Sequence, residues 1–169
     1  MLVESRTLMR LIDHIEENLA LDRDGVLDTA TLAVNAGKKP TEGTVKICTG
    51  ATLQVGQSGT VSLGSNLTLA DRACLGFNYT SKDEPVLDLS GKTVTFAGGA
   101  TPNVTVRISA TDGKRAHKGD NVLTTGGKFA GATVTVADGA PDWVMSVSVD
   151  ANGNIVMKAK PSGIMILVR

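Results

Sequence analysis

The chain has 169 residues with 17 basic and 17 acidic side chains, so its formal net charge is zero, which argues against a nucleic-acid-binding domain or a protein that binds anionic membranes. Glycine is frequent, at 19 residues, and the aromatic residues are one Trp, one Tyr and three Phe, yet 41% of the chain is hydrophobic. Small and β-branched side chains must therefore fill the core, which disfavours most enzyme folds and favours a repetitive β structure.

The N-terminal segment, residues 1–20, carries the only helical period in the sequence. Its apolar stripe consists of Leu8, Leu11, Ile12, Ile15 and Leu19. We predict a helix that caps one end of the domain, and a partner-binding helix is the alternative. The first residues lack the basic and apolar regions of a secretory signal, and no stretch approaches the ~18 apolar residues of a membrane span, so membrane insertion is not expected.

After this segment the apolar residues follow a period of two. Short apolar-x-apolar runs recur at nearly even spacing, starting at Val45, Leu53, Val61, Leu67 and Leu75. Three steps, as from Val45 to Leu67, match the length expected when three short strands form one turn of a solenoid. Strands this short become stable when each pairs with the turns above and below it. The sequence therefore predicts an all-β chain in which residues 21–140 form a right-handed parallel β-helix (β-solenoid) of about four three-strand coils.

The same alternation predicts which side chains face the core. The residues expected to be buried are Leu53, Val61, Leu67 and Leu75. The residues expected to be exposed are Gln54, Ser62 and Thr68. Gly50, Gly56, Gly59 and Gly64 are expected at the corners between the runs, where a positive φ suits glycine.

Residues 141–169 are expected to form a C-terminal β-hairpin cap. An Asn-Gly dipeptide between the alternating runs Val147–Val149 and Ile155–Met157 is the strongest short-range hairpin signal. A further strand is expected at Ile164–Val168. Because the bare end of a solenoid would be a template for edge pairing, we expect Trp143 to pack under this hairpin as part of the cap.

Catalytic, cofactor-binding and metal-binding motifs are not found, and we predict that the chain is not an enzyme. His14 and His117 have no partner at metal or triad spacing, and no nucleophile elbow, Walker A or dinucleotide fingerprint occurs. The run Asp150-x-Asn152-x-Asn154 lacks the glycine and the final carboxylate of a calcium loop and is explained by the hairpin turn.

The two cysteines, Cys48 and Cys74, are well separated along the chain. A chain of this length does not need a disulfide for stability, and neither cysteine lies near a histidine in the sequence. Two structural thiols, one disulfide and a metal site remain the alternatives.

A small polar and basic loop is expected over Thr111–Asp120, where it interrupts the coils. It contains Lys114, Arg115, His117 and Lys118, with two aspartates close by that reduce its charge. Lys114, Arg115 and Lys118 are the candidates for a weak contact with an anionic glycan, and a solvated loop is the alternative.

The coil sequences resemble the passenger β-helix of bacterial autotransporters and related surface proteins with autotransporter-associated β-strand repeats. The resemblance is carried by Gly50–Gly56 (GATLQVG), Gly59–Gly64 (GTVSLG) and Leu67–Phe77, and covers about residues 45–96. It implies a non-enzymatic, secreted or surface-displayed stalk or adhesin, part of a longer precursor, with a host or glycan surface as its partner.

Two other functions are consistent with the sequence. A carbohydrate-binding or carbohydrate-active β-helix would need an exposed aromatic platform or a groove of carboxylates, and Tyr79 is the only tyrosine. A phage fibre segment would need to form a trimer. No nucleic-acid partner is expected.

Overall fold

The computed structural model describes residues 31–34, 43–56, 59–80, 84–97, 102–111 and 113–161. Every regular element in these ranges is a β-strand, which confirms the all-β prediction, and no helix there could cross a membrane. The strands are β1 (Thr31–Val34), β2 (Thr44–Ile47), β3 (Thr52–Gly56), β4 (Thr60–Ser62), β5 (Asn66–Leu69), β6 (Ala73–Tyr79), β7 (Val86–Asp88), β8 (Val94–Phe96), β9 (Asn103–Ala110), β10 (Gly119–Val122), β11 (Thr124–Thr125), β12 (Thr133–Val136), β13 (Val144–Val149) and β14 (Ile155–Ala159). The helix expected over residues 1–20 and the strand expected at Ile164–Val168 lie outside the described residues.

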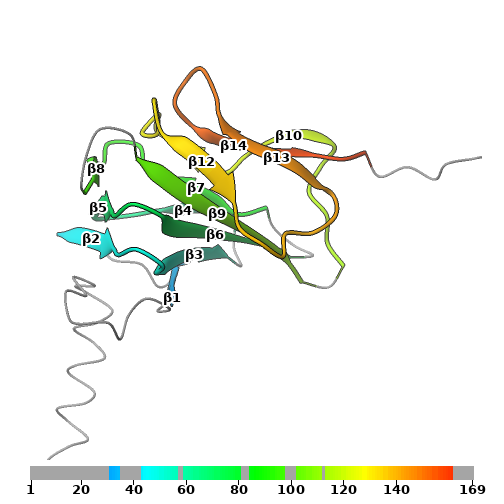
Figure 1. The fold of residues 1–169 in the computed structure, drawn as a ribbon, viewed down its shortest axis with the longest axis horizontal. Helices are drawn as coiled ribbons and strands as arrows, with labels where there is room; N and C mark the ends of the chain where they lie inside the picture. Colours follow the sequence, from blue (N-terminus) through cyan, green and yellow to red (C-terminus); the bar gives the residue numbers. More distant parts are fainter. Residues whose placement is uncertain are drawn as a thin grey trace, which may run out of the picture.

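Most strands pair in parallel, in three separate sheets (Figure 1). The sheet orders are β1-β3-β6-β9-β12, β2-β5-β8 and β4-β7-β11. From β2 to β6, each strand pairs with the strand three places later in the chain, so three consecutive strands belong to three different sheets. β7 departs from this rule and pairs with β11. The expectation of parallel pairing through residues 45–77 is confirmed.

The register between strands matches the predicted repeat at the start, and the separation between partners then lengthens. Val45 pairs with Leu67 and Leu53 pairs with Leu75, so partners are three steps apart in the predicted repeat. Ala73 pairs with Val104, a longer separation along the chain. The connections between strands therefore grow while the pairing stays in parallel register, because longer surface connections add little free-energy cost to pairing.

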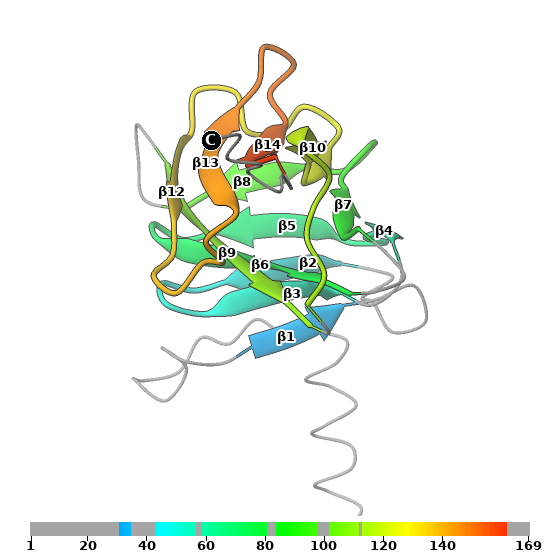
Figure 2. The ribbon, with the colours of Figure 1, turned by 90° about the vertical axis from the view of Figure 1, so that its right-hand side faces the viewer.

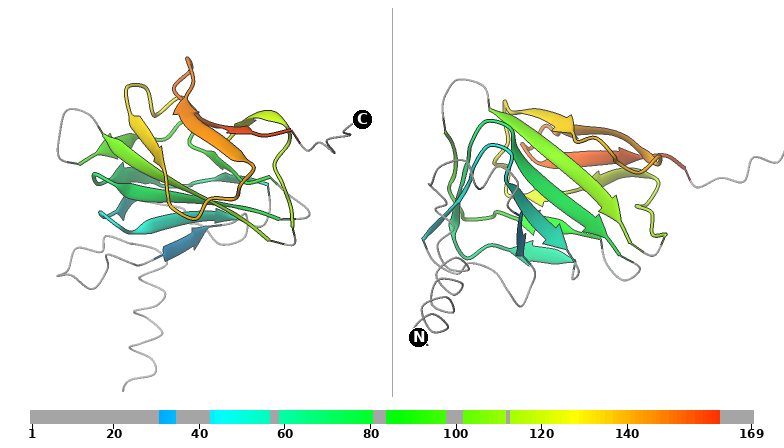
Figure 3. Two further views of the ribbon diagram at one scale, coloured as in Figure 1. Left: turned by 45° about the vertical axis from the view of Figure 1, so that its right-hand side comes forward. Right: turned by 60° about the horizontal axis from the view of Figure 1, so that its bottom comes forward.

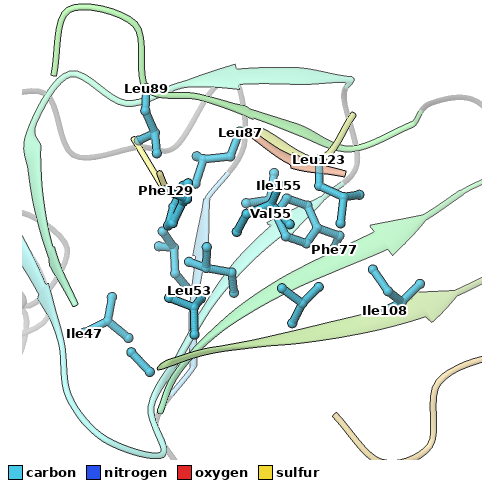
Figure 4. Close-up of a cluster of buried hydrophobic side chains, with 14 of the residues drawn as sticks. Ile47, Leu53, Val55, Phe77, Leu87, Leu89, Ile108, Leu123, Phe129 and Ile155 are labelled. Carbon is cyan, nitrogen blue, oxygen red and sulfur yellow. The ribbon is translucent and has the colours of Figure 1, made fainter. Parts of the chain in front are cut away.

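The inward positions form one apolar core. Leu53, Val61, Leu67 and Leu75 are at most 1% exposed, as predicted. Figure 4 shows the core cluster, in which side chains of the five-stranded sheet meet those of other elements; the labelled members include Leu53, Val55, Phe77, Leu87, Leu123, Phe129 and Ile155. Four of the five aromatic residues, Phe77, Tyr79, Phe129 and Trp143, also belong to this core.

The outward positions are less uniform than predicted. Ser62 is exposed, whereas Gln54 and Thr68 are half-buried. The Gln54 side chain lies over Gly76 on the adjacent strand β6, and its amide Nε2 donates a hydrogen bond to the Val55 carbonyl at 3.2 Å. Outward side chains are thus partly covered by their neighbours in the stack.

Of the four glycines expected at corners, two have the predicted conformation, whereas Gly56 is the last residue of strand β3 and Gly64 has no positive φ. Gly50 and Gly59 have positive φ angles of 78° and 70°. A side chain at either position would be strained, because L-residues rarely adopt this part of φ/ψ space.

The remaining sheet is antiparallel, with the order β10-β14-β13. The β13–β14 hairpin forms as predicted, and its turn is stabilised by Asp150, whose carboxylate accepts hydrogen bonds from the backbone N–H groups of Asn152 and Asn154. These hydrogen bonds hold the pKa of Asp150 below its usual value. β10 joins the other side of β14, and it begins at Gly119, inside the segment expected to be loop.

The antiparallel sheet lies at one end of the stack, opposite β1 (Figures 2 and 3). Backbone hydrogen bonds join it to the parallel part, because Leu123 N–H donates to the Ile155 carbonyl at 2.9 Å and Leu87 N–H donates to the Leu123 carbonyl at 2.8 Å. Trp143, directly before β13, is buried with its ring edge-to-face against Tyr79 at the end of β6, 5.5 Å between centroids. The hairpin is therefore packed against the parallel strands rather than projecting from them.

Candidate functional site

The basic loop predicted from the sequence follows β9 and is anchored at its start. Thr111 N–H donates to the carbonyl of Tyr79 at 2.8 Å, and Lys114 N–H donates to the carbonyl of Thr111 at 3.2 Å. Lys114 is half-buried, while Arg115 is exposed. The first cations of the loop therefore extend from a turn that is fixed to the end of β6.

The other end of the loop is closed by a buried amide. Asn121 on β10 is only 6% exposed, and its Nδ2 donates to the carbonyls of His117 at 2.8 Å and Gly119 at 2.9 Å. Lys118 lies within this closed turn and is exposed. The loop thus holds its charged side chains on a defined backbone.

A carboxylate from the preceding connection contacts the loop. His117 Nε2 lies 3.2 Å from Glu84 Oε1, and the His117 side chain is mostly exposed. Glu84 also lies near Tyr79, since burial and then the Glu84 charge raise the pKa of the Tyr79 hydroxyl well above its usual value. The Glu84 carboxylate therefore lies close to His117, and its charge acts on Tyr79. No local pattern signals this contact, because Glu84 and His117 are far apart in the sequence.

Two further lysines, which sequence reasoning missed, adjoin the loop through the antiparallel sheet. Gly119 pairs with Ala159 and Asp120 with Lys158, so Lys118 and Lys160 flank the last paired residues. Lys118, Lys158 and Lys160 are all exposed. We call the surface formed by these three lysines the basic face, and Lys114 and Arg115 lie on the loop that leads into it. The Lys-x-Lys alternation at the end of β14 was a visible signal, but its proximity to the loop depends on the β10–β14 pairing.

Asp120 adds one carboxylate to this face, directly across from Lys158. Among the described residues, no carboxylate lies within 4.0 Å of the side-chain nitrogens of the basic face. Asp112, which the sequence also places near the loop, is outside the described residues.

Other carboxylates connect neighbouring strands. Asp88 on β7 accepts hydrogen bonds from Ser62 Oγ on β4 at 2.9 Å, from Thr125 Oγ1 on β11 at 2.8 Å and from Ser90 N–H at 3.0 Å. These donors hold the pKa of Asp88 far below its usual value, with the hydroxyl and backbone of Ser90 contributing most. Asp88 is thus committed to joining the three strands of its sheet.

Asp88→Asn is expected to lower the free energy of unfolding by about 1–3 kcal/mol at pH 7, because an amide nitrogen cannot accept the Ser62 hydroxyl and the charge-assisted bonds are lost. A depressed folded-state pKa gives stability that is complete above the unfolded value and is lost as the pH falls towards the folded value. The difference between the two proteins should therefore shrink between about pH 4 and pH 2 in urea titrations.

Asp138→Asn is the matched control, because Asp138 is exposed, and it should change stability by less than about 0.5 kcal/mol. An equal loss for Asp88→Asn at pH 7 and pH 2 would contradict a role for the ionised carboxylate.

A second side-chain ladder, a set of hydrogen bonds that joins neighbouring strands as Asp88 does, lies at the corner between β5 and β6. Asp71 Oδ1 accepts a hydrogen bond from Asn103 Nδ2 at 2.9 Å, and the Asp71 carbonyl accepts one from Thr49 Oγ1 at 2.9 Å.

Cys48 and Cys74 are thiols, half-buried and buried, with no disulfide between them. The described residues contain no group of three or more His, Cys, Asp or Glu side chains that could hold a metal ion.

Comparisons with family models, with curated proteins and with solved structures find no match to this chain. The resemblance to autotransporter passengers stays a likeness carried by the coil sequences from Gly50 to Phe77. Function is therefore inferred from the parallel sheets, their side-chain ladders and the basic face.

Proposed function

We propose that this chain is a non-enzymatic structural and adhesive module of a bacterial surface or secreted protein, built as a right-handed parallel β-helix. The observation that carries the proposal is the pairing of each strand from β2 to β6 with the strand three places later. In a three-sided coil this pairing arises when each turn stacks on the turn before it. The three parallel sheets would then be the three sides of the coil.

The side-chain ladders support a scaffold. Asp88 connects β4, β7 and β11, and Asp71 connects corners that are far apart along the chain, through Thr49 and Asn103. Carboxylates used in this way stabilise the stack of strands, whereas a glycosidase or lyase keeps carboxylates directed to a substrate groove. Secretion, surface display and origin from a longer precursor are proposed from the resemblance to passenger sequences.

The architecture is tested by an experimental structure of the full chain together with its mass in solution. We expect a right-handed path through the three parallel sheets and a species that is not an obligate trimer. A left-handed path would overturn the proposed helix, and a stable trimer would favour the phage fibre alternative.

The non-enzymatic assignment is tested by incubating the chain with neutral and acidic polysaccharides. New reducing ends and unsaturated uronate, measured by its ultraviolet absorbance, would report hydrolase and lyase activity. We expect neither product. Product formation that disappears in Glu84→Gln, the carboxylate beside Tyr79 and His117, would instead support a carbohydrate-active module.

A further inference from the structure

The basic face combines two parts of the chain that are far apart in the sequence. In an antiparallel pair, residues opposite each other place their side chains on the same face, and alternate residues along a strand share that face. Lys158 lies opposite Asp120, so Lys158 and Lys160 share the exposed face of the antiparallel sheet with Asp120 and Lys118. Lys158 and Lys160 therefore place their ammonium groups in a row along the direction of β14, with a spacing of about 7 Å.

Hydroxyl groups lie beside these lysines on the next strand. Ser146 of β13 pairs with Lys158, and Ser148 pairs with Val156. Both serines are exposed. The face therefore offers hydrogen-bonding hydroxyls next to ammonium groups, a combination that suits a partner with both anionic and hydroxyl groups.

The aromatic residues argue against a partner that binds by stacking. Tyr79, Phe77, Phe129 and Trp143 are buried, and Phe96 is half-buried. Single-stranded nucleic acids require exposed aromatic side chains, and nucleic-acid-binding domains usually carry a large positive charge, whereas this chain has a net charge of zero. A local cluster of cations with neighbouring hydroxyls remains, and it fits a polysaccharide recognised by its charge.

We propose that the basic face binds an anionic polysaccharide, a chain of sulfated or carboxylated sugars, across the exposed face of β14 and the loop that leads into β10. Lys158 and Lys160 form the central contacts. Lys118, Lys114 and Arg115 extend them along the loop that Asn121 holds closed. The inference rests on the proposed adhesive function, whose ligand class it specifies.

The test measures binding of heparin, a sulfated polysaccharide, to the full chain by calorimetry at two salt concentrations. The double substitution Lys158→Glu and Lys160→Glu should weaken binding by about tenfold or more and reduce its salt dependence, because fewer counterions are released. Lys46→Glu is the control for a charge reversal elsewhere on the chain, since Lys46 lies on β2 in a different sheet, and it should leave affinity within about twofold.

Several outcomes would overturn the inference. Absence of heparin binding by the wild-type chain, or an equal loss in Lys46→Glu, would remove the site from this face. Tighter binding of duplex DNA, or binding of phosphatidylserine vesicles without heparin binding, would replace the polysaccharide with another partner.

Two further measurements keep the test clear of folding effects. Far-UV circular dichroism and melting curves verify each variant, and Lys158→Gln with Lys160→Gln is the milder pair if the glutamates disturb folding. Loss of binding alone leaves the β-helix proposal intact, because that proposal depends on strand path and mass.

Discussion

Replacing Leu67 with aspartate is expected to leave the chain largely unfolded at 25 °C. Leu67 is fully buried on β5, the central strand of its sheet, where it pairs with Val45 on β2 and Val94 on β8. The substitution removes a large apolar side chain from the core and buries a carboxylate among apolar neighbours. Losses above about 4 kcal/mol are expected, which is most of the stability of an ordinary domain.

The measurement is urea or thermal unfolding followed by circular dichroism. Thr95→Asp is the matched control, because Thr95 is exposed on the adjacent strand β8, and its effect should stay within about 0.5 kcal/mol. An unchanged melting temperature for Leu67→Asp would place Leu67 outside the core and would contradict the inward face of β5.

Local pattern predicted much of this fold. Alternation of apolar and polar residues is a property of a few neighbours, so the strands around Leu53, Val61, Leu67 and Leu75 and their buried faces follow directly from the sequence. The even spacing of the apolar runs also predicted the parallel register of Leu53 with Leu75. Even spacing predicts this register because connections of equal length bring each strand back beside the strand three steps earlier.

Pairing outside the regular repeat, between segments far apart in the sequence, could not be predicted. Gly119–Val122 has little apolar character, and its assignment as β10 depends on the antiparallel register with Lys158 and Met157. The hairpin signal of Asn-Gly identified β13 and β14 but did not indicate that another strand would join them. Whether such a segment forms a strand depends on its hydrogen bonds to residues distant in the sequence and not on its local β-propensity.

The candidate site shows the same division. The loop cations Lys114, Arg115 and Lys118 were visible as a cluster in the sequence. Lys158 and Lys160 were visible only as outward residues of a strand, and their place on the basic face follows from the β10–β14 pairing. The β10–β14 pairing therefore adds two lysines to a candidate site for which the sequence alone showed only the few cations of the loop.

Replacing Gly126 with alanine is expected to destabilise the chain by about 2–5 kcal/mol, through conformational strain and overpacking together. Gly126 follows β11 with a φ of 97°, a conformation that side chains rarely adopt. A Cβ atom there would lie 2.7 Å from the carbonyl carbon of Leu89 and 2.8 Å from the nitrogen of Ser90. Backbone atoms at the end of β7 cannot move aside as a flexible side chain can, so overpacking adds to the conformational strain.

Gly131→Ala separates the two effects. Gly131 also has a positive φ, 79°, but nothing lies within 4 Å of the position that an added Cβ would take, so conformational strain of about 1–2 kcal/mol is the whole expected cost. Urea unfolding of both variants measures the difference, which we attribute to the close approach of β11 and β7. Equal losses would contradict that contact and would mean that the end of β7 yields to an added methyl group. A larger loss at Gly126 would support tight backbone packing between the ends of β11 and β7, two neighbouring strands of one parallel sheet.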